Sequence, residues 1–248
     1  MTPTLDGVPV SSLARRWGVP QVKVMKTTTS SMDAAHALGA AGAPAGTVIV
    51  ADEQTAGRGR EGRTWHSPLG GAWLAVLLRP TQAAAGVLSI RAGLVVADAV
   101  DDALGSARSQ LKWPNDVLVD DRKVAGVLCE GRWQGDVLQW LVLGVGVNVA
   151  NEIPRELAGS AAAMREFAPH VRRIDLLDRL VSGVAAVVRG GPSLSEAECH
   201  AFAERDWLRG RALSAPGVGR AGGIRANGAL LIEAGAVTEA LDGHVELA

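Results

Sequence analysis

Hydrophobic and polar positions along this chain follow two different periods. Some segments carry apolar residues at every second position or in short continuous runs, which predicts strands, and others repeat them three or four positions apart, which predicts helices. Strands are expected at residues 46–50, 72–78, 117–119, 124–128 and 138–149, and helices at residues 30–38, 92–104, 174–188 and 195–208. Because strands outnumber helical crossovers, we expect an α+β fold built on a mixed sheet.

Capping residues mark two of the expected helix starts. Ser30 precedes an alanine-rich segment with Asp33 in its first turn, where the helix dipole favours an acidic group. Ser195 is followed three positions later by Glu198, the spacing of a capping box. Asp120 and Asp121 lie between two expected strands and predict a hairpin-like turn.

The pattern also divides the chain into three parts. After Gly210, short apolar pieces alternate with glycines, which indicates a small β-barrel at residues 209–248. Residues 1–21 are fewer than the roughly 40 that a small autonomous domain usually needs, so we expect only a short lead-in there. The main domain is then expected at residues 22–208.

Composition is that of an ordinary globular protein. The chain has 248 residues, 48% of them hydrophobic, and a formal net charge of −1, so any anion recognition must come from local groups. Cys129 and Cys199 lack a paired spacing and the histidines are scattered, so neither a zinc site nor a disulfide framework is expected. Neither a secretory signal at Met1–Gly7 nor a membrane-spanning apolar run is evident, and we expect a cytoplasmic protein that does not bind membranes.

The segment from Arg58 to Gly71, RGREGRTWHSPLGG, carries the clearest chemical signal. Arginine offers paired donors to phosphate or carboxylate, glycine allows close backbone approach, and Trp65 supplies a flat face for a base. The segment is therefore interpreted as a loop that closes over an anion. A solvated basic loop, with Trp65 filling the core, is the alternative.

Two further motifs follow in a fixed order. The sequence KWPND begins at Lys112 and KVAGVL begins at Lys123. Together with GRGREGRTW, which begins at Gly57, they resemble the catalytic domain of biotin protein ligases, with a match from about residue 22 to residue 149 and a weaker one towards the C-terminus.

This resemblance implies activation of biotin by ATP to biotinyl-5'-AMP, then transfer to a lysine of the biotin carboxyl carrier domain of acetyl-CoA carboxylase or another acyl-CoA carboxylase. It also implies a fold of the biotin/lipoate ligase type followed by a small SH3-like β-barrel. ATP and biotin are the expected substrates, with Mg²⁺ accompanying ATP and no dedicated metal site. Because residues 1–21 leave no room for a winged helix-turn-helix, the monofunctional type without DNA binding is expected, as a monomer or weak homodimer.

The resemblance also assigns residues. Biotin contacts are expected from Ser30, Ser31, Gln54, Arg58, Gly59, Arg60, Lys123, Gly126, Gly144 and Gly146, and ATP or adenylate contacts from Arg58, Arg60, Arg63, Trp65, Lys112, Asn115, Lys123 and Asn148. Catalysis is expected from Lys123 and Arg58, whose charges bring carboxylate and phosphate together, and from Asp116, which would orient the acceptor amine. The alternatives are an exposed lysine after a hairpin, a turn aspartate, and serines that only cap a helix.

One position departs from the family pattern. The family usually has Ser-Thr-Asn where this chain has Ser30-Ser31-Met32, and a methionine side chain cannot replace the hydrogen bonds of an amide. The sequence therefore does not decide whether residue 32 contacts the ligand.

Three other functions compete with this interpretation. A lipoate or octanoate ligase or transferase would share the fold, a nucleic-acid-binding protein could use Gly-Arg repeats, and a silent paralogue could bind biotin without catalysis. Basic and acidic residues number 25 and 26, which argues against a broad basic face. The run from Gly144 to Val149 lacks the third glycine of a dinucleotide fingerprint, and no phosphate loop with GK[ST] is present.

Overall fold

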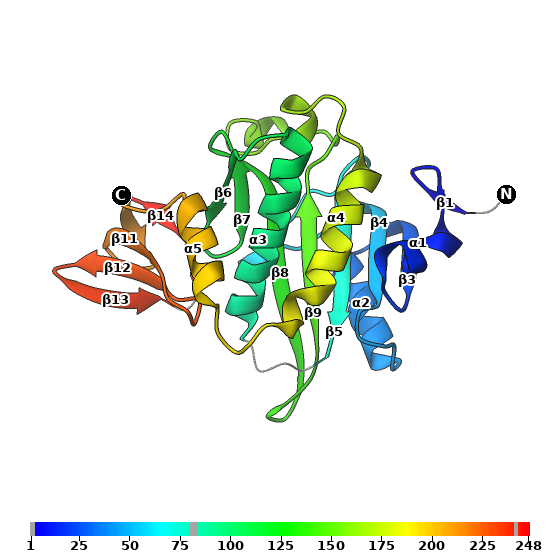
Figure 1. Ribbon diagram of the computed structural model, residues 1–248, viewed down its shortest axis with the longest axis horizontal. Coiled ribbons are helices and arrows are strands. Elements are labelled where there is room, and N and C mark those ends of the chain that lie inside the picture. Colours follow the sequence, from blue (N-terminus) through cyan, green and yellow to red (C-terminus); the bar gives the residue numbers. More distant parts are fainter. Residues whose placement is uncertain (1–2, 80–83, 241–242) are drawn as a thin grey trace.

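The computed structural model describes residues 3–79, 84–240 and 243–248. Its centre is a sheet of β3 (Val22–Thr28), β4 (Val48–Gln54), β5 (Ala72–Leu78), β6 (Ser109–Lys112), β7 (Asp116–Val119), β8 (Arg122–Gln134) and β9 (Val137–Val147). The strands are ordered β3-β4-β5-β9-β8-β7-β6 (Figure 1). The β3–β4 pair is parallel and the other pairs are antiparallel, which confirms the predicted mixed sheet.

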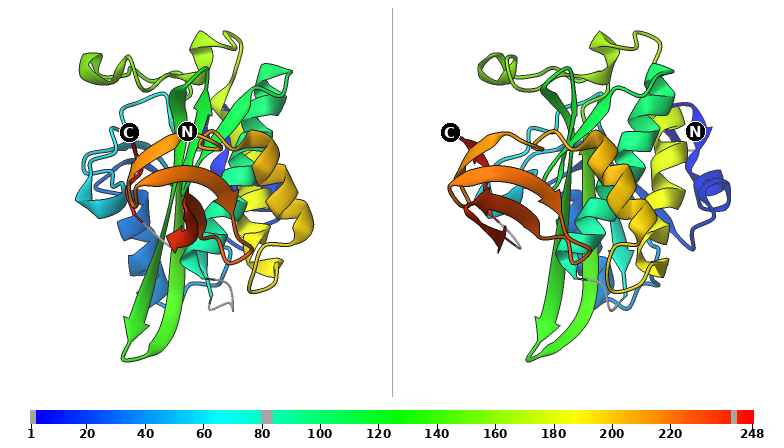
Figure 2. Two further views of the ribbon diagram at one scale, coloured as in Figure 1. Left: turned by 90° about the vertical axis from the view of Figure 1, so that its left-hand side faces the viewer. Right: turned by 60° about the vertical axis from the view of Figure 1, so that its left-hand side comes forward.

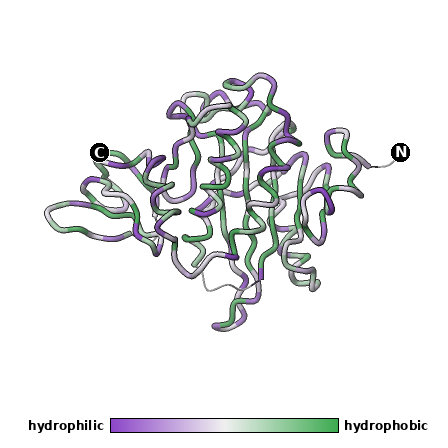
Figure 3. The backbone as a smooth tube through the Cα atoms, viewed as in Figure 1, coloured by the Kyte–Doolittle hydropathy of each residue, from purple (hydrophilic) through white to green (hydrophobic). Residues whose placement is uncertain are grey.

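Helices cover both faces of this sheet. Helix α2 (Ser31–Ala40) packs on one face, and α3 (Ala85–Leu104) and α4 (Arg173–Ala186) pack on the other (Figure 1). Short 3-10 helices lie at Arg60–Gly62, Arg155–Leu157, Met164–Glu166 and Val187–Arg189. Apolar residues concentrate in the central strands and in α3 (Figure 3), because the strands are enclosed between the two helical layers and α3 packs on the sheet.

Side chains along β9 alternate between the two faces of the sheet, and this alternation determines where the functional site lies. Leu143, Val145 and Val147 point into the main core with α3 and α4. Val142 points to the opposite face, under α2, and the next two residues on that face are Gly144 and Gly146. These glycines leave the sheet without side chains just beyond the start of α2, and the functional site lies there.

The C-terminal part forms a second sheet. Helix α5 (Glu196–Arg205) leads to β10 (Ala212–Ala215), β11 (Gly219–Ile224), β12 (Leu230–Ala234), β13 (Ala236–Ala240) and β14 (Glu246–Leu247). The order is β13-β12-β11-β10-β14, all antiparallel, and the sheet is strongly curved (Figure 2), consistent with the small barrel-like domain that was predicted. Residues 241–242 of the expected barrel lie outside the described residues.

The N-terminal segment is folded against the main domain. It forms the hairpin β1 (Thr4–Leu5) and β2 (Val8–Pro9), followed by α1 (Val10–Trp17). The indole nitrogen of Trp17 donates to Asp178 of α4 (2.8 Å). Residues 1–2 lie outside the described ranges. The domain boundaries 1–21, 22–208 and 209–248 remain predictions.

Several element limits differ from the predicted ones. Helix α3 begins at Ala85 instead of residue 92, because Val87 and Leu88 are buried although Gly86 and Ser89 interrupt the apolar period. Helix α5 ends at Arg205 instead of residue 208, because the next residues extend along β6: Trp207 N donates to Leu111 O (3.0 Å).

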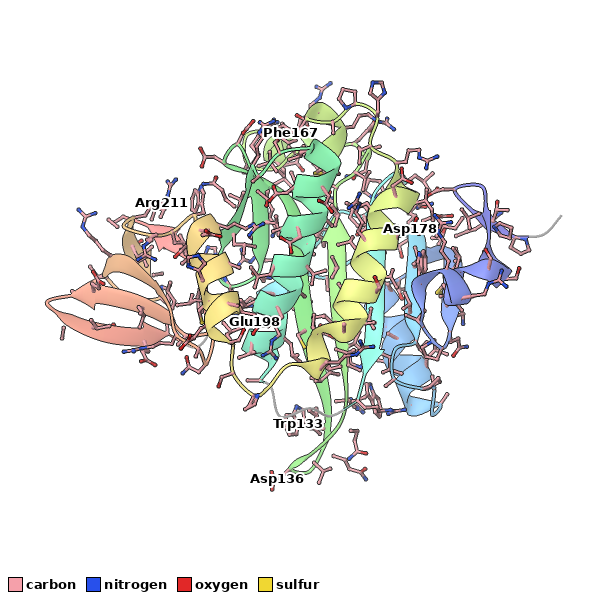
Figure 4. All side chains as sticks on the ribbon, in the orientation of Figure 1. Trp133, Asp136, Phe167, Asp178, Glu198 and Arg211 are labelled. Carbon is pink, nitrogen blue, oxygen red and sulfur yellow. The ribbon has the colours of Figure 1, made fainter. Side chains whose placement is uncertain are left out.

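Strand limits differ for similar reasons. Strand β4 runs to Gln54 because β3, which was not predicted, pairs along it as far as that residue. Strand β8 continues beyond the predicted residue 128 to Gln134, because its pairing with β9 extends the hairpin past the sheet; Trp133, near the tip, is 59% exposed (Figure 4). Strand β6 was also not predicted.

Candidate functional site

A cavity of about 190 Å³ opens over the glycines of β9, and most of the predicted site residues line it. They are Ser30, Ser31, Gln54, Arg58, Gly59, Arg60, Arg63, Trp65, Lys112, Asn115, Asp116, Lys123, Gly126, Gly144 and Gly146. Asn148 is the predicted residue that does not line this cavity. Segments far apart in sequence therefore meet here, from the start of α2 to the last strands of the sheet.

The floor of the cavity requires glycine. A Cβ carbon on Gly144 would lie 2.6 Å from the sulfur of Met32, and one on Gly146 would lie 2.6 Å from Nε1 of Trp65. At Gly126 the nearest atom is a ring carbon of Trp65, at 3.1 Å. Glycine at these positions lets Met32 and Trp65 lie directly on the sheet, and a side chain there would push them into the cavity.

The end of the cavity beside α2 carries short polar groups. Ser30 Oγ accepts from the backbone N–H of Met32 (3.2 Å) and so caps α2 while it also lines the cavity. Gln54 Oε1 accepts from Ser31 N (2.7 Å), and Gln54 Nε2 donates to Ser67 Oγ (2.8 Å). The Met32 side chain is buried near Gly144, so this position contributes an apolar surface.

Lys123 and Asp116 form the charged centre of the site. The β7–β8 hairpin brings them together, and Lys123 Nζ lies 2.7 Å from Asp116 Oδ1. The same ammonium lies 4.8 Å from the ring centroid of Trp65, within range of a cation–π interaction. The predicted hairpin turn at Asp120-Asp121 is confirmed, because both residues adopt positive φ.

Lys112 adds a half-buried cation. Burial lowers the pKa of Lys112, and the nearby charges of Lys123, Arg63 and Arg211 lower it further, while Asp116 opposes them. Lys112 thus lies among other cations, which have their own partners: Lys123 pairs with Asp116, Arg63 with Glu61 and Arg211 with Asp121. Such an arrangement favours binding of an anion with several charges.

Residues 57–66, here called the arginine loop, line the cavity beside these groups. Gly59 N donates to Arg63 O (2.7 Å), and Glu61 adopts a φ of 56° within the short 3-10 helix. Arg58 pairs with Asp33 and, at 3.0 Å, with Glu130. The loop is thus folded and attached to α2 and β8 through Arg58.

A second cavity, of about 430 Å³, adjoins the first. Arg63, Trp65, Lys112, Asp116 and Lys123 line both cavities. Asn148 lines the second, where it is buried and its Oδ1 accepts from Asn151 Nδ2 (3.1 Å). Two ligands could therefore lie side by side and meet at Lys123 and Trp65.

Comparison with known proteins identifies the family. Residues 23–148, just over half of the chain, match the family model described as the Biotin/lipoate A/B protein ligase family. The chain belongs to the biotin/lipoate A/B protein ligase family.

Individual members of the family extend this finding. The bifunctional ligase/repressor BirA of Bacillus subtilis is 37% identical over 146 residues, 56% of this chain and 45% of that protein. The biotin--[acetyl-CoA-carboxylase] ligase of Mycobacterium tuberculosis is 39% identical over 169 residues, 63% of this chain and 60% of that protein. The matched segment thus spans less than two thirds of these relatives.

Solved structures of the family share the fold. The biotin protein ligase of Aquifex aeolicus in complex with biotin and ATP aligns with a TM-score of 0.75 and 28% identity, covering 92% of this chain and 99% of that one. The biotin protein ligase of Leishmania major in complex with biotinyl-5-AMP gives a TM-score of 0.63 and 26% identity, covering 92% and 98%.

Some residues of this family member's site were missed by the sequence analysis. His244 and Val245 line the first cavity from the C-terminal segment, and His244 Nδ1 lies 2.9 Å from Arg63 Nη2. Trp207, between α5 and β10, lines the second. No local motif marks these residues, because their contacts depend on how the C-terminal sheet packs against the main domain.

Two negative findings concern the described residues alone. Across residues 3–79, 84–240 and 243–248, no group of three or more His, Cys, Asp or Glu could hold a metal ion. Within the same ranges, no helix has both the length and the apolar character needed to cross a membrane.

Proposed function

We propose that this protein is an ATP-dependent biotin protein ligase, which forms biotinyl-5'-AMP and transfers the biotinyl group to a lysine of a carrier domain. The observation that carries the proposal is the meeting of two cavities at Lys123 and Trp65. A carboxylic acid in the first and a nucleotide in the second would bring their reacting ends together between positive groups. The relatives named as biotin ligases support this choice of acid.

In the first half-reaction, a carboxylate oxygen of biotin attacks the α-phosphorus of ATP. A new O–P bond forms, the bond from the α-phosphorus to the bridging oxygen breaks, and pyrophosphate leaves. The reactants repel each other, so Lys123, Lys112 and Arg63, which line the shared region, would neutralise them. Hydrogen bonds from charged donors contribute roughly 1.5 to 3 kcal/mol each, and two or three could raise the rate by several powers of ten.

In the second half-reaction, a lysine amine attacks the carbonyl carbon of the adenylate. The C–N bond forms, the C–O bond to AMP breaks, and the amine loses a proton. Presenting a neutral lysine near pH 7.4 costs on the order of 4 kcal/mol. Asp116, the first residue of β7, lines the cavity and is proposed to orient the amine while the proton is lost.

Biotin's ureido ring needs a few polar partners in an otherwise apolar slot. Ser30, Ser31 and Gln54 would supply them at the α2 end of the first cavity, and Met32 and Trp65, which lie on the glycines of the floor, would supply the apolar surface. Arg58, Gly59 and Arg60 of the loop would close over it, which would exclude water from the reactive anhydride.

Magnesium would accompany ATP. Mg²⁺ is usually held by substrate phosphates with one or two carboxylates and several waters. Asp121 and Glu152 line the second cavity as separate carboxylates, which fits this mode better than a cage of protein ligands. Bound there, the ion would offset the negative charge of the triphosphate.

A lipoate or octanoate ligase is the second candidate, because the family includes lipoate ligases and Met32 makes the α2 end more apolar than an amide would. Biotin is favoured because the named relatives are biotin ligases.

The proposed acceptor is the carrier domain of acetyl-CoA carboxylase or another acyl-CoA carboxylase, and the proposed location of the reaction is the cytoplasm. We also propose a monomer or weak homodimer that does not bind DNA.

Pyrophosphate release from ATP tests this function. Purified protein would be incubated with Mg²⁺ and ATP plus biotin, lipoate, octanoate or no acid. Release that depends on biotin is expected. Release with lipoate or octanoate alone would move the protein to the second candidate, and no release with any acid would leave only a silent binder.

A further inference from the structure

Arg58 lies at the end of a chain of side-chain contacts that runs from the sheet to the arginine loop. Trp140 on β9 donates to His36 Nδ1 (3.0 Å), and His36 Nε2 lies 3.2 Å from Glu130 Oε2. The same carboxylate oxygen accepts from Arg58 Nη2 (3.0 Å). Arg58 Nη1 pairs with Asp33 of α2.

The direction of each hydrogen bond follows from the groups involved. An indole N–H can only donate, so Nδ1 of His36 must accept. The ring hydrogen of a neutral His36 is then on Nε2, directed at Glu130, and Trp140 thereby fixes both the tautomer and the ring orientation. Glu130 therefore accepts one hydrogen bond from His36, whose orientation is fixed, and one from Arg58 of the loop.

The charges in this cluster keep the carboxylate ionised. The hydrogen bond from His36 lowers the pKa of Glu130 below its ordinary value of 4.5, burial opposes this, and pairing with Arg58 lowers it further. Glu130 and Asp33 together place two carboxylate groups around one guanidinium. Arg58 is therefore held on two sides by elements outside the loop.

We propose that Glu130, oriented by His36 and Trp140, is a positioning residue that holds the arginine loop closed through Arg58. Glu130 is on β8, a central strand, so the loop is attached to a rigid part of the fold. Elsewhere the loop is held by its own turn, by the pair between Arg63 and His244, and by Trp65, which packs on the backbone of Gly146. This inference rests on the proposed function, because a closed loop retains the adenylate and excludes water from it.

The test compares Glu130→Ala, Glu130→Gln and a matched control, Glu204→Gln. Glu204 also pairs with a histidine, His200, at 3.3 Å, but both are exposed on α5. The first readout is hydrogen exchange at residues 57–66. We expect exchange about tenfold faster in Glu130→Ala, an intermediate effect in Glu130→Gln, which keeps an acceptor, and no change in the control.

The second readout is AMP formation from ATP and biotin without any carrier domain. A loop that opens more often lets adenylate escape or hydrolyse, so carrier-free AMP formation is expected to rise about five- to tenfold in Glu130→Ala. Because catalysis is also expected from Arg58, the double variant is read by hydrogen exchange at residues 57–66. There Glu130→Ala is expected to add no further effect in an Arg58→Ala background, since both changes would break the same attachment.

The outcomes are distinguishable. Unchanged loop exchange in Glu130→Ala, or a full additional effect in the Arg58→Ala background, would overturn the positioning role. If wild-type protein forms no AMP from biotin, the proposed function fails, while loop exchange still tests the attachment between Glu130 and Arg58.

Discussion

The indole of Trp65 packs directly on the backbone of Gly146, with Nε1 only 2.6 Å from where a Cβ carbon of residue 146 would lie. This nitrogen is buried and has no hydrogen-bond partner among the described residues. An unsatisfied buried donor costs about 1 to 3 kcal/mol, so a ligand that moves Trp65 or accepts from it would relieve this cost. Trp65 and the floor strand therefore define the cavity together.

Replacing Gly146 with alanine is expected to displace Trp65 and reduce the space above β9. Biotin affinity measured by titration calorimetry should fall at least tenfold, with only a small change in melting temperature, because Trp65 belongs to a loop. Gly159→Ala is the matched control, because a Cβ carbon there meets nothing within 4 Å. Unchanged biotin affinity in Gly146→Ala would refute the placement of the ligand on this floor.

Lys123→Ala removes the cation shared by both cavities. Pyrophosphate release with biotin and ATP should fall at least a hundredfold, comparable to losing one strong donor at a reacting centre. The circular dichroism spectrum should be retained, because Lys123 is partly exposed at the cavity wall. Lys23→Ala, at an exposed position on β3, serves as the control. Near-normal release by Lys123→Ala would remove Lys123 from the proposed mechanism.

Asp116→Asn should separate the two half-reactions. The change keeps the shape of the side chain but removes the charge proposed to orient the amine. Single-turnover transfer from preformed biotinyl-5'-AMP to a carrier domain is expected to slow by about a hundredfold, and adenylate formation by much less. Equal losses in both steps would show instead that Asp116 acts by fixing Lys123, with which it pairs at 2.7 Å.

His244→Ala tests the contribution of the C-terminal sheet. Arg63 Nη2 donates to His244 Nδ1 (2.9 Å) and also pairs with Glu61 (3.1 Å), so losing the histidine should loosen Arg63 and raise the KM for ATP about fivefold. The KM for biotin should change less, and His244→Gln, which keeps an acceptor, should restore much of the effect. His200→Ala on α5 is the control. Equal KM values for ATP in His244→Ala and wild type would exclude this contact from nucleotide binding.

Stability at acid pH should depend on Glu198. Burial would raise the pKa of Glu198, but hydrogen bonds from Arg91 and Ser195 outweigh it and hold the pKa below its ordinary value of 4.5. A depressed carboxyl pKa contributes stability above the unfolded value, and that stability is lost as the pH falls through the folded value. The free energy of unfolding, measured with urea, should therefore fall less between about pH 5 and 3 in Glu198→Gln than in wild type. Parallel losses would contradict this role.

The sequence predicted features whose cause is local. The strand Ala72–Leu78 has the predicted limits because every residue in it is apolar and buried. The Ser195–Glu198 capping box is confirmed, since both of its hydrogen bonds join residues three positions apart. The three motifs of the resemblance also located most of the first cavity, because they supply its loop and the β7–β8 hairpin.

Features that depend on distant partners were not predicted. Strand β6 is short and forms by pairing with β7, and α5 ends where the chain meets Leu111, far earlier in the sequence. His244 reaches Arg63 across 181 positions. The contact between Arg58 and Glu130 spans 72 positions. Neither period nor motif encodes such contacts, because they follow from how whole elements pack.

Biotin transfer is tested by the mass of a purified biotin carrier domain after incubation with this protein, Mg²⁺, ATP and biotin. We expect a gain of one biotinyl group on a single lysine, dependent on ATP and lost with Lys123→Ala. An unmodified carrier domain in the presence of active wild-type protein would contradict the proposed function. So would a carrier domain that gains a lipoyl or octanoyl group when those acids replace biotin, and gains nothing with biotin.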